Sequence, residues 1–69
     1  MAELLSTIAG KVKEINIKVG QMVTEDDEAF IIEAMKMENV VYGEAGVVKE
    51  LSVNVGDSVE EGAVLAIIE

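Results

Sequence analysis

The sequence contains two copies of one unit, and this repeat constrains the fold more than any other feature. Residues 1–33 align with residues 37–69 at an offset of 36 without a gap, so that only residues 34–36 are left over. Two units this short bury little surface alone, so we expect them to share one core and to be related by a pseudo-two-fold axis. The match is closest in three pairs of segments: 10–14 with 46–50, 19–20 with 55–56, and 31–33 with 67–69. The repeat predicts that Lys36, at the join, lies at one pole and that both chain ends lie at the other.

Length and composition predict one small ordered domain over residues 1–69. About half of the chain is apolar (51%), and much of that is β-branched valine and isoleucine, which suits a packed β structure. The chain has no cysteine and no histidine. A zinc site would therefore need carboxylates alone, and the commonest general base is missing. We expect no metal site and no catalytic residues.

The charge of the chain restricts its partners. Fourteen acidic residues against five lysines give a net charge of −9, which repels nucleic acid and anionic membranes. We expect partners with basic or apolar docking surfaces. No cationic leader and no long apolar run is present, so the sequence predicts no targeting peptide and no membrane span. We therefore expect a cytoplasmic location.

Hydrophobic alternation predicts strands in both copies. Val12, Ile15, Ile17 and Val19 should face one side and the intervening polar residues the other, with a bulge at the slip between Val12 and Ile15. A turn at Gly20 and a short strand at Val23 follow. The second copy repeats the plan of strand, turn, short strand, turn and strand at 48–68. The chain should therefore be all-β, with residues 1–9 as an edge strand that closes on the other chain end.

The acidic segment 24–28 holds four consecutive carboxylates, Glu25 to Glu28. A calcium loop would need alternating Asp or Asn ligands, and that spacing is absent. The segment is predicted to be a solvated turn.

Residues 29–42 pose a conflict between local propensity and the repeat. They contain no glycine or proline and include good helix formers. The repeat instead matches residues 31–33 to a terminal strand and residues 37–42 to the first strand, which leaves three residues to reverse the chain. A hairpin this tight needs positive φ at its centre, so Met35 and Lys36 should be strained there. Such strain is more often found where a loop tip has a function.

The residues around this join read Glu33-Ala34-Met35-Lys36-Met37-Glu38. Here the sequence closely resembles the biotinyl domain of the biotin carboxyl carrier family of biotin-dependent carboxylases. The similarity covers nearly the whole chain and includes the paired Gly-x-Val and Val-x-x-Gly segments. It implies a flattened β-barrel, or barrel-sandwich hybrid, of two four-stranded antiparallel sheets with an internal two-fold. It also implies that biotin is attached covalently to Lys36 at a hairpin tip.

The resemblance further implies a non-catalytic carrier subunit or domain. A biotin protein ligase would modify Lys36, and the arm would then carry carboxylate between a biotin carboxylase and a carboxyltransferase or decarboxylase. Met35 and Met37 would be soft apolar contacts for these enzymes, and Ala34 would let the ligase approach. Glu33 and Glu38 should be solvated and could help ligase recognition.

Two departures from the family pattern lie in turns. Many members have a proline before the second Gly-x-Val, where this chain reads Val41 to Gly46 without one, and many have Gly-Asp where Asp26-Asp27 stands. No insertion that could form a thumb over the biotin is present.

Three alternatives stay open. A lipoyl carrier of a 2-oxoacid dehydrogenase would share the fold, but lipoyl domains place Asp-Lys-Ala at the tip, not the Met-Lys-Met of this chain. An unmodified interaction module would keep the fold without the cofactor. An independent enzyme is the least favoured, since no nucleophile–base pair or metal set is visible.

Overall fold

The computed structural model describes residues 1–69 and consists of eight strands joined by turns. The strands are β1 (Ala2–Leu5), β2 (Gly10–Ile15), β3 (Met22–Val23), β4 (Glu28–Ala34), β5 (Met37–Tyr42), β6 (Gly46–Leu51), β7 (Ser58–Val59) and β8 (Val64–Ile68). They form two four-stranded sheets with the orders β1-β8-β6-β3 and β5-β4-β2-β7, and all pairings are antiparallel. The predicted all-β flattened barrel is confirmed, and the structure contains no helix long and apolar enough to cross a membrane.

The two copies exchange strands, so that each sheet is built from both. An offset of 36 carries β2 onto β6 and β3 onto β7, and the corresponding strands occupy the same places in the two sheets. Even the bulges correspond, because the register shifts between Val12 and Glu14 in one sheet and between Val48 and Glu50 in the other. Each copy contributes two strands to each sheet, and neither copy has a core of its own.

The gapless alignment of the copies needs one correction. Ile68 pairs with Ala2, whereas its counterpart Ile32 pairs with Asn39 and not with residue 38. The first strand therefore corresponds to β5 at an offset of 37, with the buried Leu4 matching the buried Val41. The connection from β1 to β2 is thus one residue longer than the connection from β5 to β6. An ungapped alignment of the two copies does not show this difference.

The core lies between the two sheets and is made of aliphatic side chains and one aromatic ring. The largest fully buried side chains are Phe30, Ile32, Leu65, Ile68, Val12, Val23 and Val48. Val19, predicted to face inward, is instead 60% exposed, and its counterpart Val55 is 62% exposed. Ile17, beyond the end of β2, is still buried, so the alternation fails only at Val19, which lies with Gly20 in a turn.

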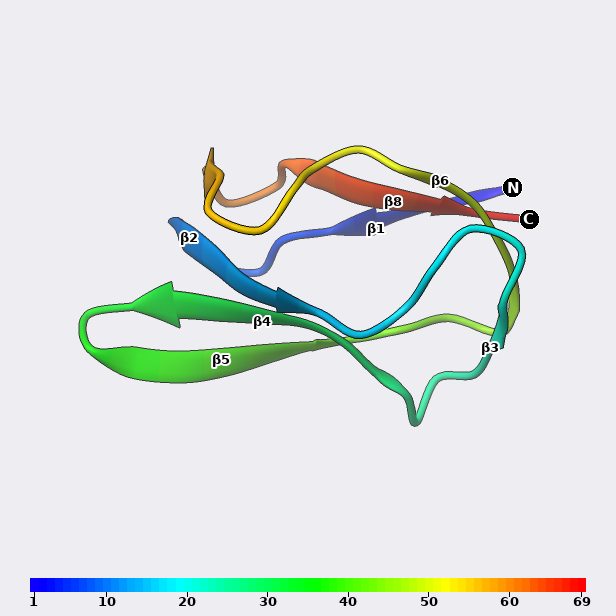
Figure 1. Cartoon of the computed structure of the whole chain (residues 1–69), viewed down its shortest axis with the longest axis horizontal. Coiled ribbons are helices and arrows are strands. Elements are labelled where there is room, and N and C mark those ends of the chain that lie inside the picture. Colours follow the sequence, from blue (N-terminus) through cyan, green and yellow to red (C-terminus); the bar gives the residue numbers. More distant parts are fainter.

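The molecule is elongated, with principal extents of 31 × 19 × 17 Å. Figure 1 shows the β4–β5 hairpin at one end of the long axis and both chain ends side by side at the other, as the repeat predicted. The predicted edge strand is β1, which pairs only with β8. Residues 24–27 form a largely exposed turn before β4, also as predicted, and the exposed Glu28 begins the strand.

Candidate functional site

The β4–β5 hairpin closes through a two-residue turn. Ala34 pairs with Met37, which leaves only Met35 and Lys36 to reverse the chain, not the three residues expected. Both turn residues have positive φ, 54° for Met35 and 63° for Lys36, as in a type I′ turn. They are the only non-glycine residues of the chain with positive φ, so the predicted strain at this tip is confirmed.

The turn presents one lysine between two exposed methionine side chains. Met35 is 90% exposed and Met37 is 67% exposed. The Lys36 side chain is also exposed, and its ammonium group takes part in no hydrogen bond or ion pair within the chain. The Lys36 amine is therefore accessible, and it lies between two flexible apolar side chains that are available for contacts with another molecule.

Ala34 lies one residue from the turn but is buried, and its small size has a packing reason. An added Cβ on Gly10 of β2 would lie 3.1 Å from the Ala34 Cβ and 2.5 Å from the Glu33 carbonyl oxygen. β2 and β4 thus approach closely beside the turn, and larger side chains at these positions would separate them.

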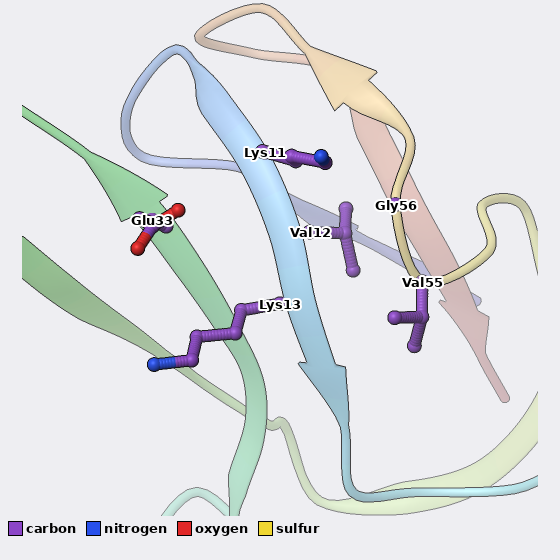
Figure 2. A pocket seen from close by; sticks show the side chains of 6 residues that line it. All are labelled: Lys11, Val12, Lys13, Glu33, Val55 and Gly56. Atoms are coloured by element: carbon purple, nitrogen blue, oxygen red, sulfur yellow. The ribbon is translucent and has the colours of Figure 1, made fainter. Parts of the chain in front are cut away.

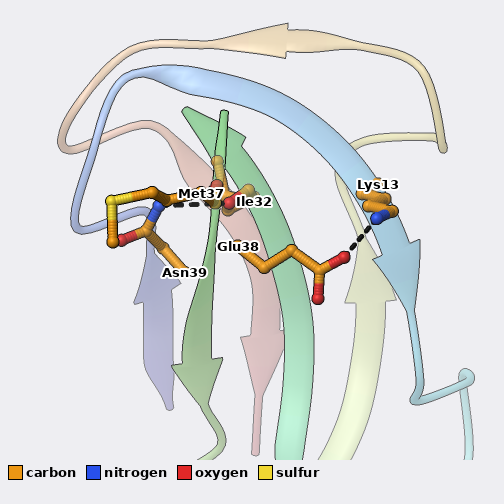
Figure 3. Close-up of polar contacts among 5 residues, drawn as sticks. All are labelled: Lys13, Ile32, Met37, Glu38 and Asn39. Atoms are coloured by element: carbon orange, nitrogen blue, oxygen red, sulfur yellow. Dashed lines mark hydrogen bonds and ion pairs between the residues drawn. The ribbon is translucent and has the colours of Figure 1, made fainter. Parts of the chain in front are cut away.

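The two glutamates of the motif face each other across β4 and β5. Glu33 and Glu38 are paired in register, and both are exposed. Glu38 accepts a hydrogen bond from the Lys13 ammonium group of β2, and the two groups form an ion pair (Figure 3). This hydrogen bond and the charge of Glu38 raise the pKa of Lys13 above its ordinary value, with smaller contributions from Glu33 and Glu14. Glu38 is therefore ion-paired and not merely solvated.

Asn39, a half-buried residue of β5, contacts the backbone of both strands of the hairpin. Its amide nitrogen lies 3.4 Å from both the Ile32 and the Met37 carbonyl oxygens, at the long limit of a hydrogen bond (Figure 3). Sequence reasoning assigned no role to Lys13 or Asn39. The contacts of Lys13 with Glu38 and of Asn39 with Ile32 cross between strands, so only the register of β2, β4 and β5 would have revealed them.

A shallow hollow of about 310 Å³ lies beside the hairpin, on β2 and the turn before β7. It is lined by Lys11, Val12, Lys13, Glu33, Val55 and Gly56 (Figure 2). In this view the Lys13 side chain extends from β2 toward β4, whereas Lys11 extends toward Gly56. The chain has no cluster of three or more residues able to ligate a metal. The site thus offers an accessible amine at the tip of a hairpin, between two exposed methionine side chains.

Comparison with known proteins agrees with this geometry. The family model described as "Biotin-requiring enzyme" matches residues 1–68. The alpha chains of mitochondrial propionyl-CoA carboxylase from Caenorhabditis elegans and Caenorhabditis briggsae are each 45% identical over 39 residues, which is 56% of this chain and 5% of the relative. The chain thus spans about a twentieth of the length of these curated relatives.

Two solved structures share the fold over nearly the whole chain. The urea carboxylase of Kluyveromyces lactis matches with a TM-score of 0.88 and 36% identity, over 99% of this chain and 6% of that chain. A single-chain, multi-domain long-chain acyl-CoA carboxylase matches with a TM-score of 0.87 and 27% identity, over 94% of this chain and 7% of that chain. Because the family model covers all but the last residue, the chain belongs to the biotin/lipoyl attachment family of biotin-requiring enzymes.

Proposed function

We propose that this chain is a biotin carrier whose attachment point is the Nζ atom of Lys36. The observation that carries the proposal is the placement of this free lysine in a strained two-residue turn at the far end of the β4–β5 hairpin. A loop tip that served only to reverse the chain would favour Asn-Gly, which adopts these φ values more readily. The presence of Met-Lys in this turn is explained if the lysine side chain itself is required.

The residues of the tip suit covalent attachment. The neutral Lys36 amine would attack an activated biotin carboxyl group, forming an amide and releasing a proton. Within the chain the Lys36 amine has no hydrogen-bond partner that could accept this proton, so the modifying ligase would take it up. Met35 and Met37 would provide apolar contacts on either side of the attacking nitrogen.

The chain would then act as a rigid handle for the cofactor. Bound biotin supplies a ureido ring that accepts and releases a carboxyl group. The lysine stem, projecting from one end of a 31 Å long molecule, would let that ring reach sites on other proteins while the domain stays intact. The chain itself would be non-catalytic, because it presents neither a nucleophile–base pair nor a metal site.

The partners follow from this role. We propose a biotin protein ligase for the attachment, and a biotin carboxylase and a carboxyltransferase or decarboxylase for the carrier cycle. The similar proteins are carboxylases of propionyl-CoA, urea and long-chain acyl-CoA, which supports a carboxylase assembly without selecting its substrate. The single-domain extent 1–69 and the cytoplasmic location stay predictions.

The test is co-expression of the chain with an active biotin ligase and excess biotin, followed by intact-mass measurement. The wild type should gain one biotinyl group, mapped to Lys36 by peptide sequencing, and Lys36→Arg should gain none. Lys18→Arg, a matched change at another exposed lysine, should be modified like the wild type.

Circular dichroism should show the same fold for all three proteins. Modification of Lys36→Arg would refute the assignment of the site. A wild-type chain that stays unmodified would support an unmodified module, and a lipoyl adduct formed with a lipoate ligase instead would support the lipoyl carrier.

A further inference from the structure

The outer face of the β1-β8-β6-β3 sheet carries exposed apolar side chains at the end of the molecule where both chain ends lie. Met22 of β3 and Val47 of β6 lie directly opposite each other and are 77% and 38% exposed. The residue that follows each of them is buried, so this pair points away from the core. On the other side of Val47, Glu69 exchanges two backbone hydrogen bonds with it, and Met1, which is 85% exposed, comes next. The row therefore holds three apolar side chains and one carboxylate.

The other sheet has polar side chains at the equivalent positions. At the offset of 36, the Met22–Val47 pair corresponds to Ser58 and Lys11, which also pair directly. At the offset of 37 that relates the first strand to β5, the counterpart of the terminal methionine is Glu38. The fold thus does not need apolar side chains in this row, and their exposure has no packing reason.

A hollow of about 520 Å³ adjoins the row on the same face of the sheet. It is lined by Met1, Glu3, Lys49, Glu50 and Ile67. Ile67 of β8 lies between Glu3 of β1 and Glu50 of β6, because both are its register partners. The two carboxylates are exposed and form no ion pair, whereas Lys49 is paired with Glu69. This face thus combines apolar side chains with two free carboxylates.

The charge of this face restricts what can cover it. A second copy of the chain would bring the same carboxylates and a net charge of −9, and nucleic acid or an anionic membrane would also be repelled. A sheet face buries apolar side chains against another packed layer, and a single helix is the simplest such layer. The complementary partner is a helix whose apolar stripe is bordered by lysine or arginine side chains.

We propose that this outer face is a docking surface for a basic amphipathic helix of a partner protein. The apolar stripe of the helix covers Met22, Val47 and Ile67, and its cations pair with Glu3 and Glu50. The β4–β5 hairpin lies at the opposite end of the 31 Å long molecule, so a partner bound here leaves the hairpin tip uncovered. The inference goes beyond the proposed function and does not depend on biotin attachment.

The test uses a synthetic helical peptide of lysine, alanine and leucine, with all leucines on one face of the helix. A scrambled peptide of the same composition has the same charge but no apolar face and is the control. NMR titration of the isotope-labelled chain gives both the affinity and the place of binding. The amide signals of Met22, Val47 and Ile67 should shift with the first peptide, and those of Lys36 and of the acidic turn 24–27 should not. Absence of binding, binding elsewhere, or equal binding of the scrambled peptide would overturn the proposal.

The repeat supplies the matched variants. Met22→Ser/Val47→Lys copies the Ser58–Lys11 pair of the other sheet into this face, and circular dichroism should show an unchanged fold. Its affinity for the peptide should fall by about tenfold or more, because two apolar contacts are lost and a like charge is added. Val55→Lys makes the same change of charge at an exposed valine beside the hairpin and should bind like the wild type. Equal affinities of the wild type and the double variant, or an equal loss in Val55→Lys, would overturn the proposal.

A second double variant tests the carboxylates without changing the apolar row. Glu3→Gln/Glu50→Gln should weaken binding of the peptide and make the affinity less dependent on salt, since two charge pairs are removed. An affinity and salt dependence like those of the wild type would refute the proposed pairing. Lys36→Arg should bind the peptide like the wild type. Because these measurements need neither biotin nor a ligase, a failure here leaves the proposed function intact, and binding by a chain that is never biotinylated would uphold this inference alone.

Discussion

Replacing Lys36 by glycine should make the protein more stable while destroying its attachment point. Lys36 has φ of 63°, a left-handed conformation that costs a non-glycine residue about 1–2 kcal/mol. Glycine removes this strain but loses more backbone entropy on folding, about 0.5–1 kcal/mol. The net gain in unfolding free energy should be about 0.5–1 kcal/mol, since no hydrogen bond or ion pair of Lys36 is lost.

This gain is measurable because the chain is small. With 69 residues, the entropy of unfolding is about 0.14 kcal/mol/K, so the melting temperature should rise by about 3–7 °C. Differential scanning calorimetry or thermal circular dichroism of the unmodified protein measures it. Lys18→Gly is the matched control, because it removes the same charge from an exposed residue without positive φ. The control should melt below the wild type.

The reasoning would be refuted if Lys36→Gly melted at or below the wild-type temperature, or if both glycine variants shifted equally. Either result would mean that the turn stores no strain at this position. A higher melting temperature of Lys36→Gly would show that the lysine makes the turn less stable than glycine would. Such a loss of stability is typical of a functional loop.

Two further predictions concern packing and pH. Gly10→Ala should lower the unfolding free energy by about 2–3 kcal/mol, because its Cβ would lie 2.5 Å from the Glu33 carbonyl oxygen. Gly20→Ala, with φ of +90° and no atom within 4 Å of its Cβ, should lose only about 1 kcal/mol, and equal losses in urea unfolding would contradict this difference. Because the folded-state pKa of Lys13 is raised above 10.5, its ion pair stabilises the fold below that pH and is lost as pH rises through the folded value. The stability difference between wild type and Lys13→Gln in urea titrations should therefore be constant well below pH 10.5 and decrease as the pH rises through the raised pKa of Lys13; a difference that does not decrease at high pH would contradict the assignment.

The β4–β5 turn shows what local propensity and the internal repeat can each predict. Propensity alone favoured a helix over residues 29–42, and the repeat correctly replaced it by a hairpin, because a copy that forms a strand in one half must form one in the other. The repeat did not give the length of the turn. Ala34 joins β4 because its partner Met37 completes the ladder, and that depends on the register between two strands.

The sequence by itself determined the all-β class, the two-fold plan, the poles of the molecule and the lysine at the hairpin tip. These features follow from the spacing of the repeat and from the alternation of apolar residues along each strand. Both patterns can be read along the chain, and both occur in each copy. Only the tertiary structure decided the exchange of strands between sheets, the one-residue shift of β1, the exposure of Val19, and the contact between Lys13 and Glu38. Each of these depends on which strand lies beside which and in what register, and a pattern along one strand does not contain that information.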